Sequence, residues 1–158
     1  MLVSLAAALS LISHSFFSLP QGGSINLGMV PIFWLALRRG WKTGIIGGAI
    51  FGMVELAIEP FIVHPAQLVL DYPLAFAALG LAGFFQNKPI LGVLFGSTGR
   101  FICHFVSGIV YFSDYAPPGM SPTLYSAIYN ASYLIPSIII SAIVIAILQK
   151  SKVLKIYL

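Results

Sequence analysis

Long apolar runs alternate along this chain with short segments that are polar or rich in proline and glycine. The breaks carry residues that interrupt helices, such as Pro20 and Gly22 after the first run and Pro60 and Pro65 before the fourth. The second run is short for a full membrane span. The pattern predicts six helices, at about residues 1–17, 27–37, 41–58, 65–85, 90–112 and 122–149.

The composition indicates that lipid surrounds most of the molecule. The chain is 59% hydrophobic and only 8% charged, with a mean hydropathy of +0.99, whereas soluble domains carry about 25% charged residues. A surface so poor in charge cannot face water on all sides. Since a span needs roughly 20 apolar residues, residues 1–158 fit one membrane domain. We therefore predict an all-α integral membrane protein, a six-transmembrane-helix bundle.

The basic residues are distributed asymmetrically over this predicted topology. All except Arg100 fall in residues 38–42, at Lys88 or in residues 150–155, which six spans bring to one side. The opposite loops hold no lysine or arginine, so the positive-inside rule places the basic side and both termini in the cytoplasm. Topology thus explains the net charge of +4. The scattered basic residues form no face that would track phosphates, which argues against nucleic acid as a partner.

Ionisable residues inside the predicted helices are costly in lipid and point to function. Helical rise places Asp71 roughly 10 Å and His104 roughly 12 Å below the outer ends of their helices. Tyr125 and Asn130 lie roughly 5 to 12 Å down the last helix. Three helices thus bring polar residues to a similar depth near the outer face, which predicts a pocket there.

A carboxylate among aromatic rings suits a flat, cationic ligand that forms hydrogen bonds. Asp71 supplies the carboxylate, and Asn130 supplies both a donor and an acceptor. The rings nearby in the sequence are those of Tyr72, Phe112, Tyr125, Tyr129 and Tyr133. The expected pocket ligand is therefore a small organic cation rather than an anion.

Each of these residues also has a purely structural interpretation. Tyr129 and Tyr133, four residues apart, are also typical of interhelix packing, and Asn130 of hydrogen bonding between helices. His104 also fits a core histidine with satisfied hydrogen bonds. Asp71 is also suited to pairing with Arg100. Glu55, near the outer end of its helix, is expected to be able to reach water.

Several functional classes lack their sequence signatures. No G-x-x-x-x-G-K-[ST] segment occurs, so the chain hydrolyses no nucleotide by that route. The single cysteine, Cys103, excludes an intrachain disulfide, and the three histidines lie on separate segments, which gives no metal site. The chain is also small for an alternating-access transporter and lacks paired interrupted helices. These features favour a capture subunit that works with partners.

Two alternatives from other classes stay open at this point. One is a small membrane enzyme that uses Asp71 and His104 as an acid–base pair. The other is a structural or assembly protein without a ligand.

Five stretches together resemble the thiamine-specific S component of energy-coupling-factor (ECF) vitamin transporters. They are LPQGGSINLGMVPIF (19–33), LRRGWKTGIIGG (37–48), HPAQLVLDYPLAFAALGLAGFF (64–85), HFVSGIVYFSDYAPPG (104–119) and LYSAIYNASYLIP (124–136). Their order and spacing extend over nearly the whole chain.

The resemblance implies a six-helix membrane fold with an outward-facing thiamine pocket, without a cofactor or a catalytic residue. It implies a monomer in the bacterial plasma membrane that assembles with a membrane coupling subunit and two ABC-type ATPases, which use the ATP. A ligand other than thiamine, either another cationic vitamin or a thiamine precursor, stays open.

Matching the family's motifs assigns roles to particular residues. The implied substrate-binding residues are Asp71, Tyr72, His104, Gly108, Phe112, Tyr125 and Asn130. The implied gating loop over the pocket consists of Gln21, Gly22, Gly23 and Ser24. Val3 and Ala7, at the positions of a small-residue motif on the first helix, are expected to dock on the coupling subunit.

Overall fold

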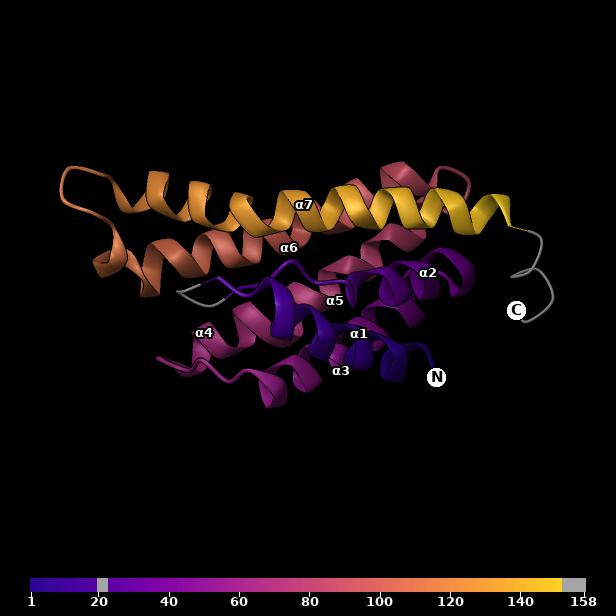
Figure 1. Ribbon diagram of the computed structural model, residues 1–158, viewed down its shortest axis with the longest axis horizontal. Helices are drawn as coiled ribbons and strands as arrows, with labels where there is room; N and C mark the ends of the chain where they lie inside the picture. The colour runs from indigo at the N-terminus through magenta and orange to yellow at the C-terminus, as the bar shows by residue number, and fades with distance from the viewer. Residues whose placement is uncertain (20–22, 152–158) are drawn as a thin grey trace.

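The computed structural model describes residues 1–19 and 23–151, and the regular secondary structure of this part consists of helices and one isolated bridge between Ser18 and Ser24. The helices lie along the long axis of the molecule (Figure 1). Five continuous helices are α1 (Leu2–Phe17), α2 (Met29–Arg39), α3 (Trp41–Ile58), α6 (Pro89–Tyr111) and α7 (Pro122–Lys150). Between α3 and α6, one rod combines α4 (Pro65–Val69), η1 (Leu70–Leu74), α5 (Ala75–Leu79) and η2 (Gly80–Phe85), and η3 (Ser113–Tyr115) precedes α7. The bounds differ from the predicted ones by at most two residues.

Four helical segments of the described chain are long and apolar enough to cross a membrane: α3, the rod 65–85, α6 and α7. The two other predicted spans are shorter. α1 is apolar and has 16 residues, and α2 has 11 residues, which at 1.5 Å per residue is about half of a ~30 Å hydrocarbon core. The expectation of six full spans thus becomes four long helices and two shorter ones.

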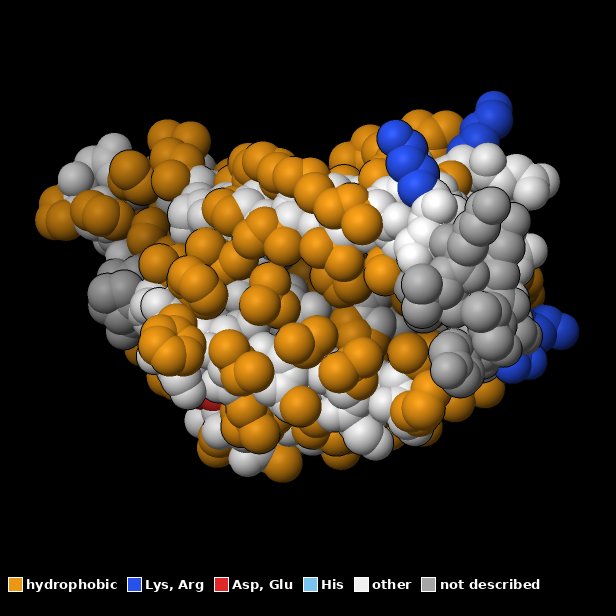
Figure 2. Space-filling view, turned by 45° about the vertical axis from the view of Figure 1, so that its right-hand side comes forward, with side chains coloured by type: hydrophobic (Ala, Val, Ile, Leu, Met, Phe, Trp, Pro, Cys, Tyr) orange, Lys and Arg blue, Asp and Glu red, His pale blue; other side chains and the backbone are white. Residues whose placement is uncertain are grey.

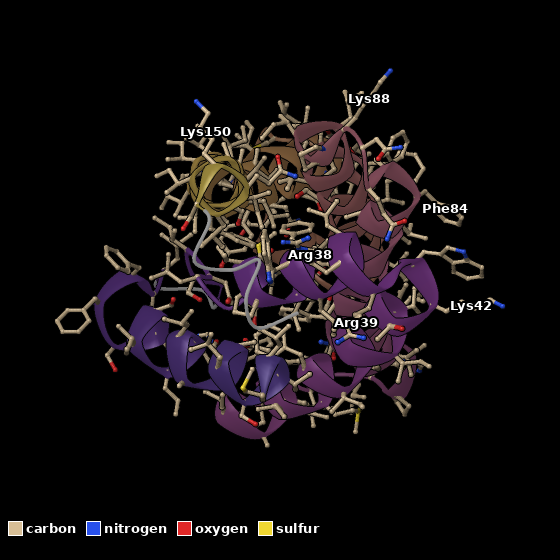
Figure 3. All side chains as sticks on the ribbon, turned by 90° about the vertical axis from the view of Figure 1, so that its right-hand side faces the viewer. Arg38, Arg39, Lys42, Phe84, Lys88 and Lys150 are labelled. Carbon is tan, nitrogen blue, oxygen red and sulfur yellow. The ribbon has the colours of Figure 1, made fainter. Side chains whose placement is uncertain are left out.

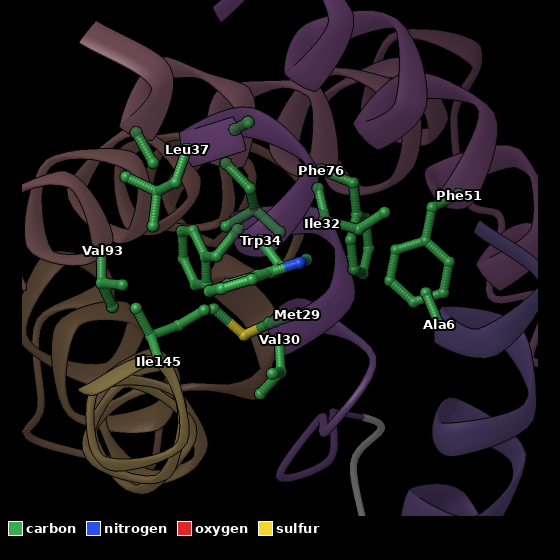
Figure 4. Packing of buried hydrophobic residues seen from close by; sticks show 14 of the residues in the cluster. Ala6, Met29, Val30, Ile32, Trp34, Leu37, Phe51, Phe76, Val93 and Ile145 are labelled. Carbon is green, nitrogen blue, oxygen red and sulfur yellow. The ribbon is translucent and has the colours of Figure 1, made fainter. Parts of the chain in front are cut away.

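The α2 helix is short because it forms the centre of the bundle. Its residues from Met29 to Trp34 are all buried. Figure 4 shows α2 side chains such as Ile32 and Trp34 surrounded by residues of the neighbouring helices, including Ala6, Phe51, Phe76, Val93 and Ile145. A helix that is apolar on nearly all sides is stable when other helices cover it.

The outer surface of the bundle is apolar along its length. Side chains such as Ile46, Ile50, Ile139 and Ile143 are each more than half exposed, and hydrophobic side chains cover most of the face in Figure 2. The described lysines and arginines other than Arg100 gather at one end, where Figure 3 shows Arg38, Arg39, Lys42, Lys88 and Lys150. This surface is what a bundle immersed in lipid requires.

Glycines bring α3 and the rod 65–85 into backbone contact. A Cβ atom on Gly44 would approach the backbone of Gly80, one on Gly48 would clash with the carbonyl of Phe76, and one on Gly52 would clash with the carbonyl of Tyr72. These glycines recur every four residues and form one face of α3, as small residues do where membrane helices approach closely. The contact fixes the position of Tyr72 and its neighbour Asp71 against α3.

A π-helical turn, η1, interrupts the rod where the site lies. It contains Pro73, which has no N–H to donate to the preceding turn and therefore disturbs the α-helical hydrogen-bond ladder. The wider π turn changes the direction of the side chains around it. Asp71 and Tyr72, although consecutive, both line the same cavity.

Candidate ligand-binding site

A cavity of about 580 Å³ lies at the end of the bundle where α1 and α3 end, whereas Arg38, Arg39 and Lys42 lie at the end of α2 and the start of α3. The C-terminal ends of α1, α3 and α6 and the N-terminal parts of the rod 65–85 and α7 form its walls. A cavity of this size is within the range of small-molecule sites. All seven residues expected to bind a substrate line it: Asp71, Tyr72, His104, Gly108, Phe112, Tyr125 and Asn130.

Only some of the other expected functional residues line the cavity. Gly23 and Ser24 of the expected gating loop line the cavity, whereas Gln21 and Gly22 lie outside the described residues. Val3 and Ala7 are half-buried on α1. Val3 packs against the hydrophobic core, so much of its surface faces inward.

Asp71 accepts hydrogen bonds from three side chains. Gln67 Nε2 and Ser107 Oγ each lie 2.8 Å from Asp71 Oδ2, and His104 Nδ1 lies 3.1 Å from Oδ1. A carboxylate offers about four acceptor positions, which leaves about one for a ligand. These bonds hold the carboxylate in one orientation at the cavity wall.

Arg100 fixes the tautomer of His104. Arg100 Nε donates to His104 Nε2 at 3.2 Å, so this ring nitrogen is an acceptor and Nδ1 carries the proton that Asp71 accepts. The guanidinium also lies over the ring of Phe76, with 4.1 Å between Cζ and the ring centroid. Arg100, His104 and Asp71 therefore form a chain of hydrogen bonds, in which His104 lies between the guanidinium and the carboxylate.

The α7 wall is held by hydrogen bonds to α6. Ser126 Oγ donates to the carbonyl of Phe105 at 2.9 Å, and Asn130 Nδ2 donates to the carbonyl of His104 at 3.3 Å. Tyr133 donates from its hydroxyl to Asn130 Oδ1 at 2.5 Å. Asn130 thus joins helices, as its structural interpretation expected, and also lines the cavity.

Aromatic rings form the mouth of the cavity. Tyr125 and Tyr129 are stacked, with ring centroids 5.8 Å apart. Phe112 lies at 5.8 Å from Phe61 and at 5.9 Å from Tyr115. Offset and edge-to-face pairs of this kind present a rigid apolar surface with negative ring faces. Such a surface is suited to a flat cation.

The sequence singled out Glu55 as an ionisable residue inside a helix, but it did not identify its neighbours His14 and Glu59. The expectation that Glu55 reaches water is wrong, because the residue is 4% exposed and its Oε2 lies 3.2 Å from His14 Nε2. The Nδ1 atom of the same histidine lies 2.5 Å from Glu59 Oε2. All three residues line the cavity. Because His14 and Glu55 are 41 positions apart, no sequence spacing signals the pair.

The outer loop is attached firmly at its C-terminal half. Asn26 donates from its backbone N–H to Ser137 Oγ at 3.1 Å and from its side chain to Ser10 Oγ at 3.3 Å. Gly23 has a φ of +80° and packs against the ring of Tyr133, since a Cβ there would lie 2.9 Å from Tyr133 Cε1. The loop therefore contacts the cavity at Gly23 and is anchored to α1 and α7 by Asn26.

Gly23→Ala is expected to weaken ligand binding by about 10-fold, because an alanine is strained at positive φ and its methyl group would displace Tyr133. Titration calorimetry of the detergent-purified protein measures the effect. Gly119→Ala is the matched control, since Gly119 also has a positive φ of 87° but nothing lies near its Cβ position. Equal affinity losses in both variants would contradict a specific role of the Gly23–Tyr133 contact.

Among the described residues, no group of three or more histidine, cysteine, aspartate and glutamate side chains is arranged to hold a metal ion. The apolar exterior, the long helices and the polar cavity at one end define an α-helical membrane protein with a binding site for a small molecule.

Comparison with known proteins identifies the family. The profile of the family described as Thiamine transporter protein (Thia_YuaJ) matches residues 1–156. The chain belongs to this family.

Two relatives and one solved structure also support membership in this family. The thiamine transporter ThiT of Bacillus subtilis (strain 168) is 40% identical over 160 residues, which cover 90% of this chain and 83% of that protein. The ThiT of Lacticaseibacillus paracasei is 28% identical over 144 residues, 78% of this chain and 72% of that protein. A structure of ThiT from Listeria monocytogenes superposes with a TM-score of 0.81 at 26% identity, covering 96% of this chain and 92% of that chain.

Proposed function

We propose that this protein is a thiamine-binding S component, which captures thiamine in the cavity between α3, the rod 65–85, α6 and α7. One observation carries the proposal: a partly buried, orientated carboxylate, Asp71, shares a cavity of about 580 Å³ with a wall of aromatic rings. Thiamine is a flat cation that carries an amino group, and this combination of groups is complementary to it. The family membership supports the same ligand.

The residues expected to contact thiamine have separable roles. Asp71 accepts a hydrogen bond from the ligand's amino group with its remaining acceptor position. Tyr125 and Asn130 fix the edges of the rings. Tyr72, His104 and Phe112 provide the surfaces against which the rings stack, and Gly108 leaves room beside them.

The residues at 21–24 are proposed to gate this cavity. Gly23 and Ser24 line it, and Asn26 anchors the segment that follows. Thiamine enters when this loop moves away from Tyr133.

We further propose that the cavity opens to the outside of a bacterial plasma membrane and that both termini are cytoplasmic. The gathering of Arg38, Lys88 and Lys150 at the opposite end supports this orientation. Uptake then requires a membrane coupling subunit and two ABC-type ATPases, which consume the ATP, while this chain joins them as a monomer without a resident cofactor. Val3 and Ala7 on α1 are the proposed docking positions.

The arrangement does not favour the acid–base enzyme that the sequence left open. A general base needs a nitrogen or oxygen that is free to take a proton from the substrate. His104 instead uses Nε2 to accept from Arg100 and Nδ1 to contact Asp71.

The direct test is thiamine binding to the detergent-purified chain, without partners, measured by titration calorimetry. A submicromolar dissociation constant for thiamine and no binding of riboflavin would support the proposal. If the folded protein does not bind thiamine, the ligand assignment is wrong, and other cationic vitamins and thiamine precursors would be titrated next.

A further inference from the structure

The cavity contains a second carboxylate, that of Glu55, which is more deeply buried than that of Asp71 and forms fewer hydrogen bonds. Its Oε2 atom contacts His14 Nε2, but its Oε1 atom is buried and forms no hydrogen bond with any described residue. The side chain lines the cavity. A buried carboxylate oxygen without a partner is costly, so this atom is suited to receiving a group from a ligand.

The charges around the two carboxylates differ. Asp71 is linked through neutral His104 to the permanent charge of Arg100, and Gln67 and Ser107 also donate to it. Arg100 also interacts with the charge of Glu55, so its positive charge is shared between the two carboxylates.

The other wall of the cavity is negative. Glu55 and Glu59 both lie within ion-pair distance of His14. Even if His14 is protonated, two carboxylates against one imidazolium leave a net charge of −1, and a neutral His14 leaves −2. With Asp71 and Arg100 included, the cavity keeps this net negative charge. Among the carboxylate oxygens of Glu55 and Asp71, Glu55 Oε1 is the one that lacks a hydrogen bond within the described chain.

We propose that Glu55, orientated by His14, is the residue that receives the positive charge of the ligand, whereas Asp71 receives an uncharged hydrogen-bond donor. This inference rests on the proposed function and makes it more specific. It assigns the positive charge of the ligand to Glu55 and the amino group of the ligand to Asp71. It also defines the ligand class as organic cations that carry a heteroaromatic amino group at a distance from the charge.

The pairing also explains why Glu55 is tolerated in the free protein. His14 at the end of α1 and Glu55 at the end of α3 join two helices across the cavity. A buried carboxylate with a single protein partner is a weak contribution to stability. Its second oxygen is available to bind a cation.

The test compares thiamine with its neutral analogue, in which carbon replaces the positively charged thiazolium nitrogen. Titration calorimetry with the purified full chain gives both affinities for the wild type and for Glu55→Gln. We expect the wild type to prefer thiamine by about 10-fold or more, as a partly buried charge pair provides. Glu55→Gln is expected to lose most of this preference, because it keeps the shape of the side chain and removes the charge.

Asp71→Asn provides the contrast between the two carboxylates. It is expected to weaken both ligands by similar factors, because both carry the same amino group. Asp114→Asn is the control for charge removal as such, since Asp114 is exposed in η3 and does not line the cavity. Its preference for thiamine should equal that of the wild type.

Glu55→Asp guards against a folding defect in the glutamine variant. It retains the charge, so it should keep a preference for thiamine even if both affinities fall. A Glu55→Gln protein that keeps the full preference, or a Glu55→Asp protein that loses it, overturns the assignment. If the wild type binds thiamine but Glu55→Gln weakens both ligands equally, only this inference fails. If the wild type binds neither compound, the proposed function itself is wrong.

Discussion

Asp71→Asn is expected to weaken thiamine binding by about 100-fold or more. In the wild type, Gln67, Ser107 and His104 all donate to the carboxylate. In the variant, the amide NH₂ group would face some of these donors, either Gln67 and Ser107 or His104, depending on its orientation. A loss of charge-assisted hydrogen bonds together with unsatisfied buried donors costs about 3 kcal/mol, and about 1.4 kcal/mol corresponds to tenfold in affinity. Titration calorimetry on the detergent-purified protein measures the change.

The control separates binding from folding. The thermal unfolding midpoint of Asp71→Asn should show that the variant is folded, and Asp114→Asn should bind thiamine as the wild type does, since its side chain lies outside the cavity. A folded Asp71→Asn protein with wild-type affinity would show that the ligand does not use this carboxylate.

Gly80→Val is expected to destabilise the folded protein by about 3 kcal/mol or more. Even a Cβ atom at residue 80 would clash with the backbone of Gly44 and Ile45, and backbone atoms in a helix cannot move aside independently. The rod 65–85 would then shift relative to α3, and with it the position of Asp71. Thermal unfolding in detergent and the fraction of monodisperse protein in gel filtration measure the loss.

Ile46→Val, on the facing helix α3, is the control. Ile46 is 62% exposed and faces away from the rod, so its trimming should change the unfolding midpoint little. If Gly80→Val unfolds at the wild-type temperature, the close contact between α3 and the rod does not limit stability.

Much of the fold follows from the local sequence. The apolar runs and the prolines between them define where helices begin and end, as at Trp41–Ile58 and Pro122–Lys150. The same runs make lipid the favourable surroundings. Burial of Met29–Trp34 was harder to foresee, because an 11-residue apolar helix has the same local pattern whether lipid or other helices cover it.

For a similar reason, only part of the candidate site could be predicted from the sequence. Asp71, His104 and Asn130 could be brought together by counting helical rise from the ends of their helices, and all three line one cavity. The roles of Arg100 and Glu55 could not be found by such counting. Depth along a helix follows from residue number, whereas the direction of a side chain depends on the packing of its helix against others.

The sequence by itself determined that the protein is a helical membrane bundle, which end carries the lysines, and at which depth the polar residues lie. These properties depend on residue order, helical rise and the cost of charge in lipid. Only the tertiary structure decided which partners the charges have. The glycine contact between α3 and the rod, the π turn at Pro73 and the His14–Glu55 pair decide this. The glycine contact and the His14–Glu55 pair join residues that are distant in sequence, and the energies of such contacts depend on distances that no local pattern contains.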